Sequence, residues 1–67
     1  MSKNMLTTKE AGLLSDLLTM EESLTKKARL YSRTMTDQSL AEQMTKIADG
    51  HERHFNALMA LLDGGGL

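Results

Sequence analysis

Three residues with metal-binding side chains stand where apolar residues would be expected. Glu21, His51 and His54 interrupt two regular patterns of apolar residues. A carboxylate and two imidazoles are suitable ligands for iron, zinc, manganese, nickel or copper, whereas magnesium and calcium prefer more oxygen atoms. Without a metal, the same groups could form a buried hydrogen-bonded network that fixes how helices pair. Both alternatives require that folding brings the three side chains together.

The first of these residues lies in a predicted helix over about 8–34. Thr7 is followed three residues later by Glu10, which is the pattern of a capping box at a helix start. The chain contains no proline, so the strongest helix breaker is absent. A single long helix is therefore expected up to the small polar residues that begin near 35.

The two histidines lie in a second predicted helix, over about 38–62. A turn at about 35–38 separates the helices, and Thr36 or Asp37 can cap the second one. The glycine-rich residues 63–67 end it and form a flexible tail. All 67 residues are thus predicted to form one domain, an all-α antiparallel two-helix hairpin.

Each predicted helix carries apolar residues spaced alternately three and four apart, as in a heptad seam. The seams consist of Leu14, Leu17, Glu21, Leu24, Ala28, Tyr31 and Met35, and of Leu40, Met44, Ile47, His51, His54, Leu58 and Leu61. Further apolar residues beside both seams make faces wider than one partner helix can cover. The hairpin is therefore predicted to homodimerise into a four-helix bundle. The alternative is a monomeric hairpin that acts as a helical adaptor for another protein.

The polar members of the seams are predicted to lie at one level of the hairpin. A turn near residue 36 or 37 makes the numbers of facing residues sum to about 73, so Glu21 faces position 52. His51 and His54 are spaced i,i+3 and project from one helix face. These residues are therefore predicted to form a transition-metal site in the dimer core. If the seam register differs by one residue, they are exposed instead.

Three acidic residues, Glu22, Asp49 and Glu52, lie beside this layer. A modest rotation of the first helix would exchange Glu22 with Glu21, whereas Asp49 and Glu52 point away from the seam. Asp49 and Glu52 either accept hydrogen bonds from the imidazole N–H groups or remain solvated.

Composition excludes several other classes of function. With 8 basic and 9 acidic side chains, the net charge is −1, so the basic field of a nucleic-acid-binding protein is missing. The absence of cysteine excludes disulfides and thiolate ligands. No apolar run has the length of a signal peptide or a membrane span, and we expect a cytoplasmic protein without a membrane partner.

Two segments carry a resemblance to a known family. Leu17-Leu18-Thr19-Met20-Glu21-Glu22-Ser23-Leu24, followed by a second helix with Ala48-Asp49-Gly50-His51-Glu52-Arg53-His54-Phe55-Asn56-Ala57-Leu58, resembles the ferritin-like superfamily. Within it, residues 12–62 are most similar to the small spore coat protein F-like proteins. The resemblance implies a four-helix bundle with a structural or assembly role in sporulation. It also implies a location that extends to the spore coat, and spore coat or other proteins as partners.

The resemblance also implies roles for the three polar residues. In di-iron members of the superfamily, each hairpin provides a Glu from its first helix and Glu-x-x-His from its second. Glu21 matches the first-helix Glu and His54 the motif His, but His51 occupies the motif Glu position. The resulting His-x-x-His lacks a bridging carboxylate, which argues against catalysis, so no catalytic residue is assigned. A di-iron-type oxidase or a metal-storage protein is the alternative function, and iron, zinc, manganese or nickel is the implied cofactor.

Overall fold

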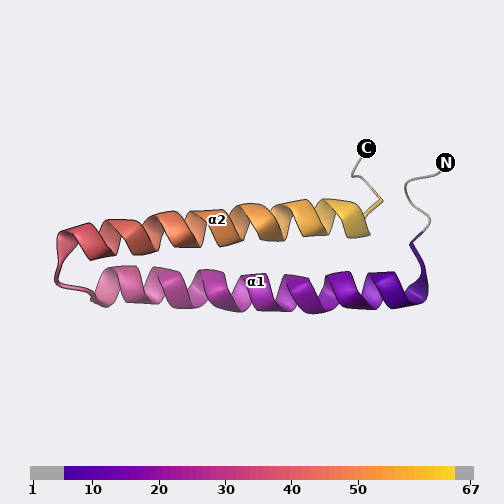
Figure 1. The fold of residues 1–67 in the computed structure, drawn as a ribbon, viewed down its shortest axis with the longest axis horizontal. Coiled ribbons are helices and arrows are strands. Elements are labelled where there is room, and N and C mark those ends of the chain that lie inside the picture. Colours follow the sequence, from indigo (N-terminus) through magenta and orange to yellow (C-terminus); the bar gives the residue numbers. More distant parts are fainter. Residues whose placement is uncertain (1–5, 65–67) are drawn as a thin grey trace.

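Two antiparallel helices make up the fold in the computed structural model, which describes residues 6–64. Helix α1 spans Thr8–Thr34 and helix α2 spans Gln38–Leu62, and they lie side by side along their whole length (Figure 1). Residues 6–64 contain no strand. The predicted all-α helical hairpin is confirmed, whereas a four-helix bundle requires a second chain. Of the predicted glycine tail, residues 65–67 lie outside the described part of the chain.

Local hydrogen bonds explain where the helices begin. The Thr7 hydroxyl accepts a hydrogen bond from the Glu10 backbone N–H at 3.0 Å, and the Glu10 carboxylate accepts one from the Thr7 backbone N–H at 3.0 Å. This pair is the predicted capping box, and it satisfies N–H groups that have no partner within the helix. At the start of α2, the Asp37 carboxylate accepts from the Leu40 N–H at 2.9 Å, so Asp37 rather than Thr36 is the cap.

The backbone conformation at single residues likewise explains where the helices end. Met35 leaves α1 in an extended conformation, with φ −72° and ψ 134°, and its N–H still donates to the Tyr31 carbonyl. After α2, Gly64 has a φ of 71°, in the left-handed region that glycine adopts without steric strain.

The contact between the helices is narrow. Only Leu18, Ala28 and Ala48 are buried among residues 6–64, and Ala48 is 0% exposed. Partly buried side chains continue the same stripes, namely Leu14, Glu21, Thr25 and Ser32 in α1 and Ala41, Met44, His51, Phe55, Leu58 and Leu62 in α2. The predicted seams are thus correct at every second position and displaced by one residue at the others. The helices contact each other along one edge of each apolar face, because one partner helix covers only part of so wide a face.

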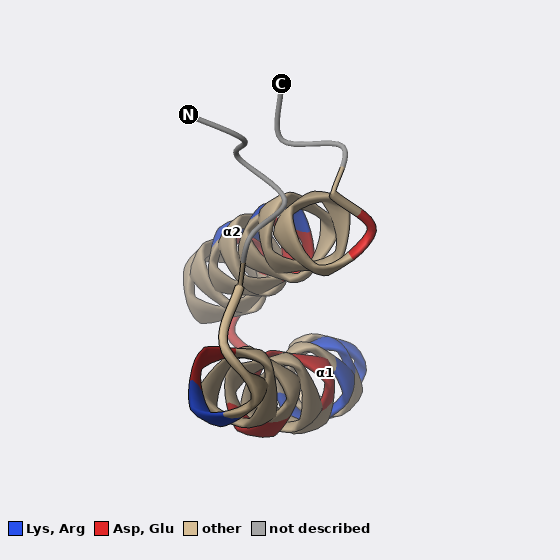
Figure 2. Ribbon diagram, turned by 90° about the vertical axis from the view of Figure 1, so that its right-hand side faces the viewer, with Lys and Arg blue, Asp and Glu red and all other residues tan. Residues whose placement is uncertain are grey.

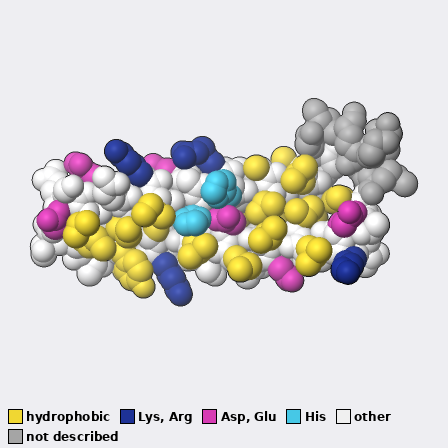
Figure 3. Space-filling view, in the orientation of Figure 1, with side chains coloured by type: hydrophobic (Ala, Val, Ile, Leu, Met, Phe, Trp, Pro, Cys, Tyr) yellow, Lys and Arg dark blue, Asp and Glu magenta, His cyan; other side chains and the backbone are white. Residues whose placement is uncertain are grey.

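The displaced seam positions leave a broad apolar face without cover. Its large side chains are between 44% and 57% exposed, and they are Leu13, Leu17, Met20, Leu24 and Tyr31 in α1 and Leu40, Ile47 and Leu61 in α2. Figure 3 shows apolar side chains gathered over both helices on this side. Viewed end-on, the hairpin is a pair of helices, and no further element of residues 6–64 covers either flank (Figure 2). We refer to these eight residues as the apolar face.

Candidate metal centre

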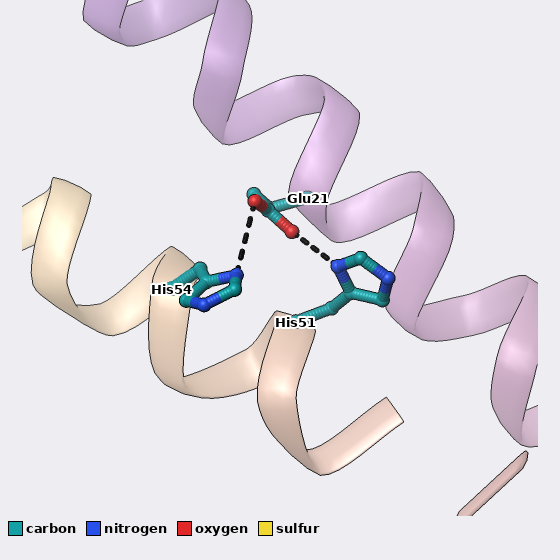
Figure 4. A group of neighbouring side chains, drawn as sticks. All are labelled: Glu21, His51 and His54. Atoms are coloured by element: carbon teal, nitrogen blue, oxygen red, sulfur yellow. Dashed lines mark hydrogen bonds and ion pairs between the residues drawn. The ribbon is translucent and has the colours of Figure 1, made fainter. Parts of the chain in front are cut away.

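The Glu21, His51 and His54 side chains converge at mid-length of the hairpin (Figure 4). Glu21 is the central residue of α1, and the histidines project from the middle of α2. The Glu21 Oε1 atom lies 2.6 Å from His51 Nδ1, and the Glu21 Oε2 atom lies 3.3 Å from His54 Nδ1. Each carboxylate oxygen therefore faces a different imidazole, and the predicted common level of the three residues is confirmed.

Exposure increases across the cluster. The side chains of Glu21 and His51 are 19% and 25% exposed, because both lie in the stripe where α1 contacts α2. His54 is 65% exposed and lies on the side of the apolar face. Figure 3 accordingly shows the imidazoles and a neighbouring acidic group in the middle of that face, with apolar side chains on both sides. The cluster is partly buried against the hairpin and open toward the apolar face.

The arrangement is compatible with coordination of one metal ion. The three residues each offer one ligand atom, and these atoms all lie within 4.8 Å of one another. Ligands about 2.1 Å from a shared zinc ion are about 3–4 Å apart, so a small contraction would place all three in a first coordination shell. The two rings meet nearly edge to face, with an interplanar angle of 79°, and each keeps its Nε2 atom for a second partner.

The same contacts also fit a metal-free network. At 2.6 Å, the His51–Glu21 contact is a short hydrogen bond or ion pair in its own right. Among residues 6–64, no buried side-chain polar atom lacks a partner. The metal site and the metal-free network therefore both remain compatible with the geometry, and metal binding stays a prediction. The third alternative, exposed side chains, holds for His54 but not for Glu21 or His51.

The acidic residues beside the cluster interact with a cation that sequence reasoning did not assign to them. Arg29 of α1 donates to Asp49 at 3.2 Å and also to Glu52, both of α2. The expected hydrogen bonds from Asp49 or Glu52 to the imidazoles do not form. The opposite charges of these acids and of the basic run at 26–29 could have indicated the contact. Arg29, however, reaches residues further along α2 than those directly opposite it.

These contacts have a clear electrostatic consequence for Arg29. Hydrogen bonds to Glu52 and then to Asp49 raise the pKa of its guanidinium above the ordinary value. A raised pKa in the folded chain stabilises the fold below that value, and the effect would be lost only at pH values high enough to deprotonate arginine. The ion pair is therefore insensitive to pH from the side of Arg29 over the neutral range.

No helix among the described residues has the length and apolar character needed to cross a membrane. No family model, no curated protein and no solved structure matches this chain. The likeness to the ferritin-like superfamily therefore rests on the residues of this chain alone and stays a prediction.

Proposed function

We propose that this chain binds a transition-metal ion through Glu21, His51 and His54, as half of a homodimeric four-helix bundle of ferritin-like type. The observation that supports this proposal is the convergence of one carboxylate and two imidazoles in the middle of an uncovered apolar face. Hairpins that expose such a face can bury it by pairing with a second hairpin. The metal ligands would then lie in the core of the bundle.

The donor set favours borderline transition metals. One carboxylate oxygen and two imidazole nitrogens suit zinc, iron, manganese or nickel. Because Glu21 belongs to α1 and the histidines to α2, a bound ion would link the two helices. An ion that binds the folded chain alone stabilises it, and this stabilisation grows with the logarithm of the free ion concentration once that concentration exceeds Kd. Metal would thus support a fold in which only three residues of the described chain are buried.

A structural or assembly role fits this donor set better than an oxidase does. A di-iron oxidase needs two metals about 3.5–4 Å apart, bridged by carboxylates. Each chain brings one carboxylate to the cluster, because His51 occupies the position where the di-iron motif has a Glu. The resemblance of residues 17–24 and 48–58 to spore coat proteins supports a role in the coat, with the cytoplasm as the site of synthesis.

Metal titration of tag-free protein tests this proposal. We expect Zn²⁺ to raise Tm and Co²⁺ to give a visible absorption band of a ligated ion. Glu21→Gln and His54→Gln should each weaken binding by at least about 10–100-fold, since even outer-shell changes have effects of this size. Glu22→Gln is the matched control, because Glu22 is an adjacent carboxylate that pairs with Lys26 instead of the histidines. Its metal affinity should equal that of the unmodified chain.

Two results would contradict the metal site. The first is a metal content below about 0.2 ion per chain, together with no gain in Tm from zinc, iron, manganese or nickel. The second is equal loss of binding in the Glu22 and Glu21 variants, which would indicate nonspecific attraction to surface carboxylates.

A further inference from the structure

The geometry points to one orientation for the partner of the apolar face, namely a second copy of this chain packed antiparallel. In this arrangement, the turn of one hairpin lies at the open end of the other. The inference rests on the homodimer of the proposed function and gives it a defined symmetry. The size of the apolar face and the central position of the polar cluster support a second copy as the partner. The charges along the edge of the face support the antiparallel orientation.

The apolar face has the size that a stable dimer needs. Helix α1 has 27 residues and the hairpin is 20 Å across, so the face covers about 40 × 20 Å, or roughly 800 Å². That value is close to the area each partner buries in an interface of standard size. Its large apolar side chains would supply the hydrophobic stabilisation that the narrow contact within one hairpin cannot.

The position of the polar cluster favours a second copy over an unrelated partner. Glu21 is the central residue of α1, and His51 is one residue beyond the centre of α2. A second copy placed face to face with its ends aligned brings its own cluster to the same level. Two carboxylates and four imidazoles would then meet at the two-fold axis. A partner without matching polar groups would bury the exposed His54 against apolar atoms, which is unfavourable.

Face-to-face pairing allows two orientations. With parallel hairpins, each α1 lies against α2 of the other copy, and both turns are at the same end. With antiparallel hairpins, α1 lies against α1 and α2 against α2, each pair in opposite directions. The two arrangements bring different charged residues together at the edges of the apolar face.

Three exposed charges distinguish these arrangements. Asp16 precedes Met20 by four residues, and Lys27 follows Leu24 by three, so both lie along the outer edge of the apolar face on α1. Lys46 occupies the corresponding edge of α2. None of the three forms an ion pair within residues 6–64.

Antiparallel pairing brings opposite charges together. With the ends of the two α1 helices aligned, facing residues have numbers that sum to 42, from Thr8 and Thr34. Asp16 then lies level with position 26, within one residue of Lys27 of the second copy. Symmetry makes two such pairs. Lys46 comes level with position 54, within one residue of Arg53 of the second copy. Arg53 lies further outward on the helical wheel than Lys46, so this like-charge contact offsets only part of the attraction.

Parallel pairing brings like charges together. There α1 of one copy faces α2 of the other with the register seen within the hairpin, in which Glu21 contacts His51. Lys27 then lies level with position 45, within one residue of Lys46, and this like-charge contact occurs twice. Asp16 comes level with position 56, where no basic residue lies nearby in the sequence except Arg53. The edge charges thus favour the antiparallel dimer.

A distance measurement between spin labels separates the two orientations. The chain lacks cysteine, so Lys9→Cys gives a single labelling site near the start of α1. In the antiparallel dimer, Lys9 is level with position 33 of the other copy, and the labels should be about 36 Å apart along the axis. In the parallel dimer they share one end, at under about 20 Å. The short distance would overturn the inference.

Charge exchange provides a second, independent test. Asp16→Lys and Lys27→Asp should each raise the dimer Kd about threefold to tenfold at low salt, and the double variant should restore it to within about twofold. Glu42→Lys is the control, because Glu42 lies on the outer side of α2, away from the apolar face, and should leave Kd unchanged. A double variant as weak as the sum of its singles would contradict antiparallel pairing.

Both experiments use metal-free buffer, so they separate the inference from the proposed metal site. An antiparallel distance in these experiments, together with no metal uptake in the separate titration, would retain the dimer geometry and remove metal binding. A monomer at all concentrations would contradict the homodimer of the proposed function itself.

Discussion

The two broad faces of the hairpin differ in how their side chains find partners. On one side, Arg29 joins α1 to Asp49 and Glu52 of α2, and Lys26 pairs with Glu22 at 3.5 Å. These charges are solvated and matched within the chain. On the other side, eight large apolar side chains are about half exposed around a carboxylate and two imidazoles. On the charged face, these side chains find their partners within a single chain. On the other face, large apolar side chains stay exposed, and three possible metal ligands lie among them.

This difference has a thermodynamic meaning. Surface ion pairs contribute little to stability, so the charged face contributes little to holding the helices together. Burial of apolar surface on association could stabilise the fold more than these ion pairs do, because a chain of 67 residues forms only a small core alone. Changes on the apolar face should therefore have larger effects than changes on the charged face.

The largest effect is expected from a charge in the centre of the apolar face. Ile47→Lys replaces a half-exposed apolar side chain with a cation, which would have to be desolvated in the proposed dimer. Because symmetry doubles the change, we expect the dimer Kd to rise at least about 100-fold, or about 2.7 kcal/mol. Sedimentation equilibrium over a range of concentrations measures this shift.

Thr45→Lys is the control for this substitution. It introduces the same cation two residues away, at an exposed position on the charged side of α2. Its Kd should stay within about twofold of the unmodified chain, since exposed substitutions usually change stability little. Equal weakening by both variants would show that the two faces do not differ in the way described here.

A second prediction separates metal binding from a metal-free network. Glu21→Leu removes the carboxylate but fills the same stripe with an apolar side chain. Both imidazoles are partly exposed and can be hydrated once the carboxylate is removed, while the new apolar side chain gains burial in the stripe. Metal-free Glu21→Leu should therefore be more stable by about 1 kcal/mol, while metal affinity is lost. This gain corresponds to roughly 4–8 °C in Tm for a chain of this size.

Glu22→Leu, at the exposed neighbouring position, should change stability by no more than about 0.5 kcal/mol. Lower stability of metal-free Glu21→Leu in urea unfolding would support the other alternative, in which the carboxylate and imidazoles stabilise the hairpin without an ion.

Features determined by local interactions could be predicted from the sequence. Thr7 with Glu10 and Asp37 with Leu40 are hydrogen-bonded over three residues, so the helix starts can be read directly. The level of the cluster also follows, because the position of the turn fixes which residues face each other. These predictions depended only on spacing along the chain.

The rotation of each helix about its axis could not be predicted in the same way. Two overlapping stripes of heptad spacing run along α1, and the stripe through Leu17 is the more apolar, because the stripe through Leu18 continues through Thr25 and Ser32. Only the contact with α2 selects the stripe through Leu18, and elsewhere along this contact the small residues Ala28 and Ala48 allow the helices to approach. The partners of Arg29 were missed because a long side chain reaches beyond the residues directly opposite it.

A glycine substitution away from both faces provides a reference for helix stability. A Cβ atom at Gly12 would meet nothing within 4 Å, so Gly12→Ala gains helix propensity without a clash. We expect stability to rise by about 1 kcal/mol in urea unfolding at a fixed protein concentration. Gly50→Ala is the comparison, because its Cβ would meet only Arg53 Nη2 at 3.7 Å within one hairpin. A smaller gain there than at Gly12 would indicate that a second chain packs near Gly50, and no gain at Gly12 would contradict an exposed site in a stable helix.

The smallest effect is expected on the charged face. Arg29→Met keeps the length and apolar character of the stem but removes the contacts with Asp49 and Glu52. Because these groups are solvated, Tm should fall slightly at low salt, and the difference should disappear at high salt as screening removes the attraction. Arg29→Lys should lie between the two, since an ammonium group retains the charge but not the two-pronged geometry. Thermal unfolding of the three chains at two salt concentrations measures this series. A large fall in Tm that persists at high salt would mean that Arg29 holds the helices together, and the charged face would then contribute to stability as the apolar face does.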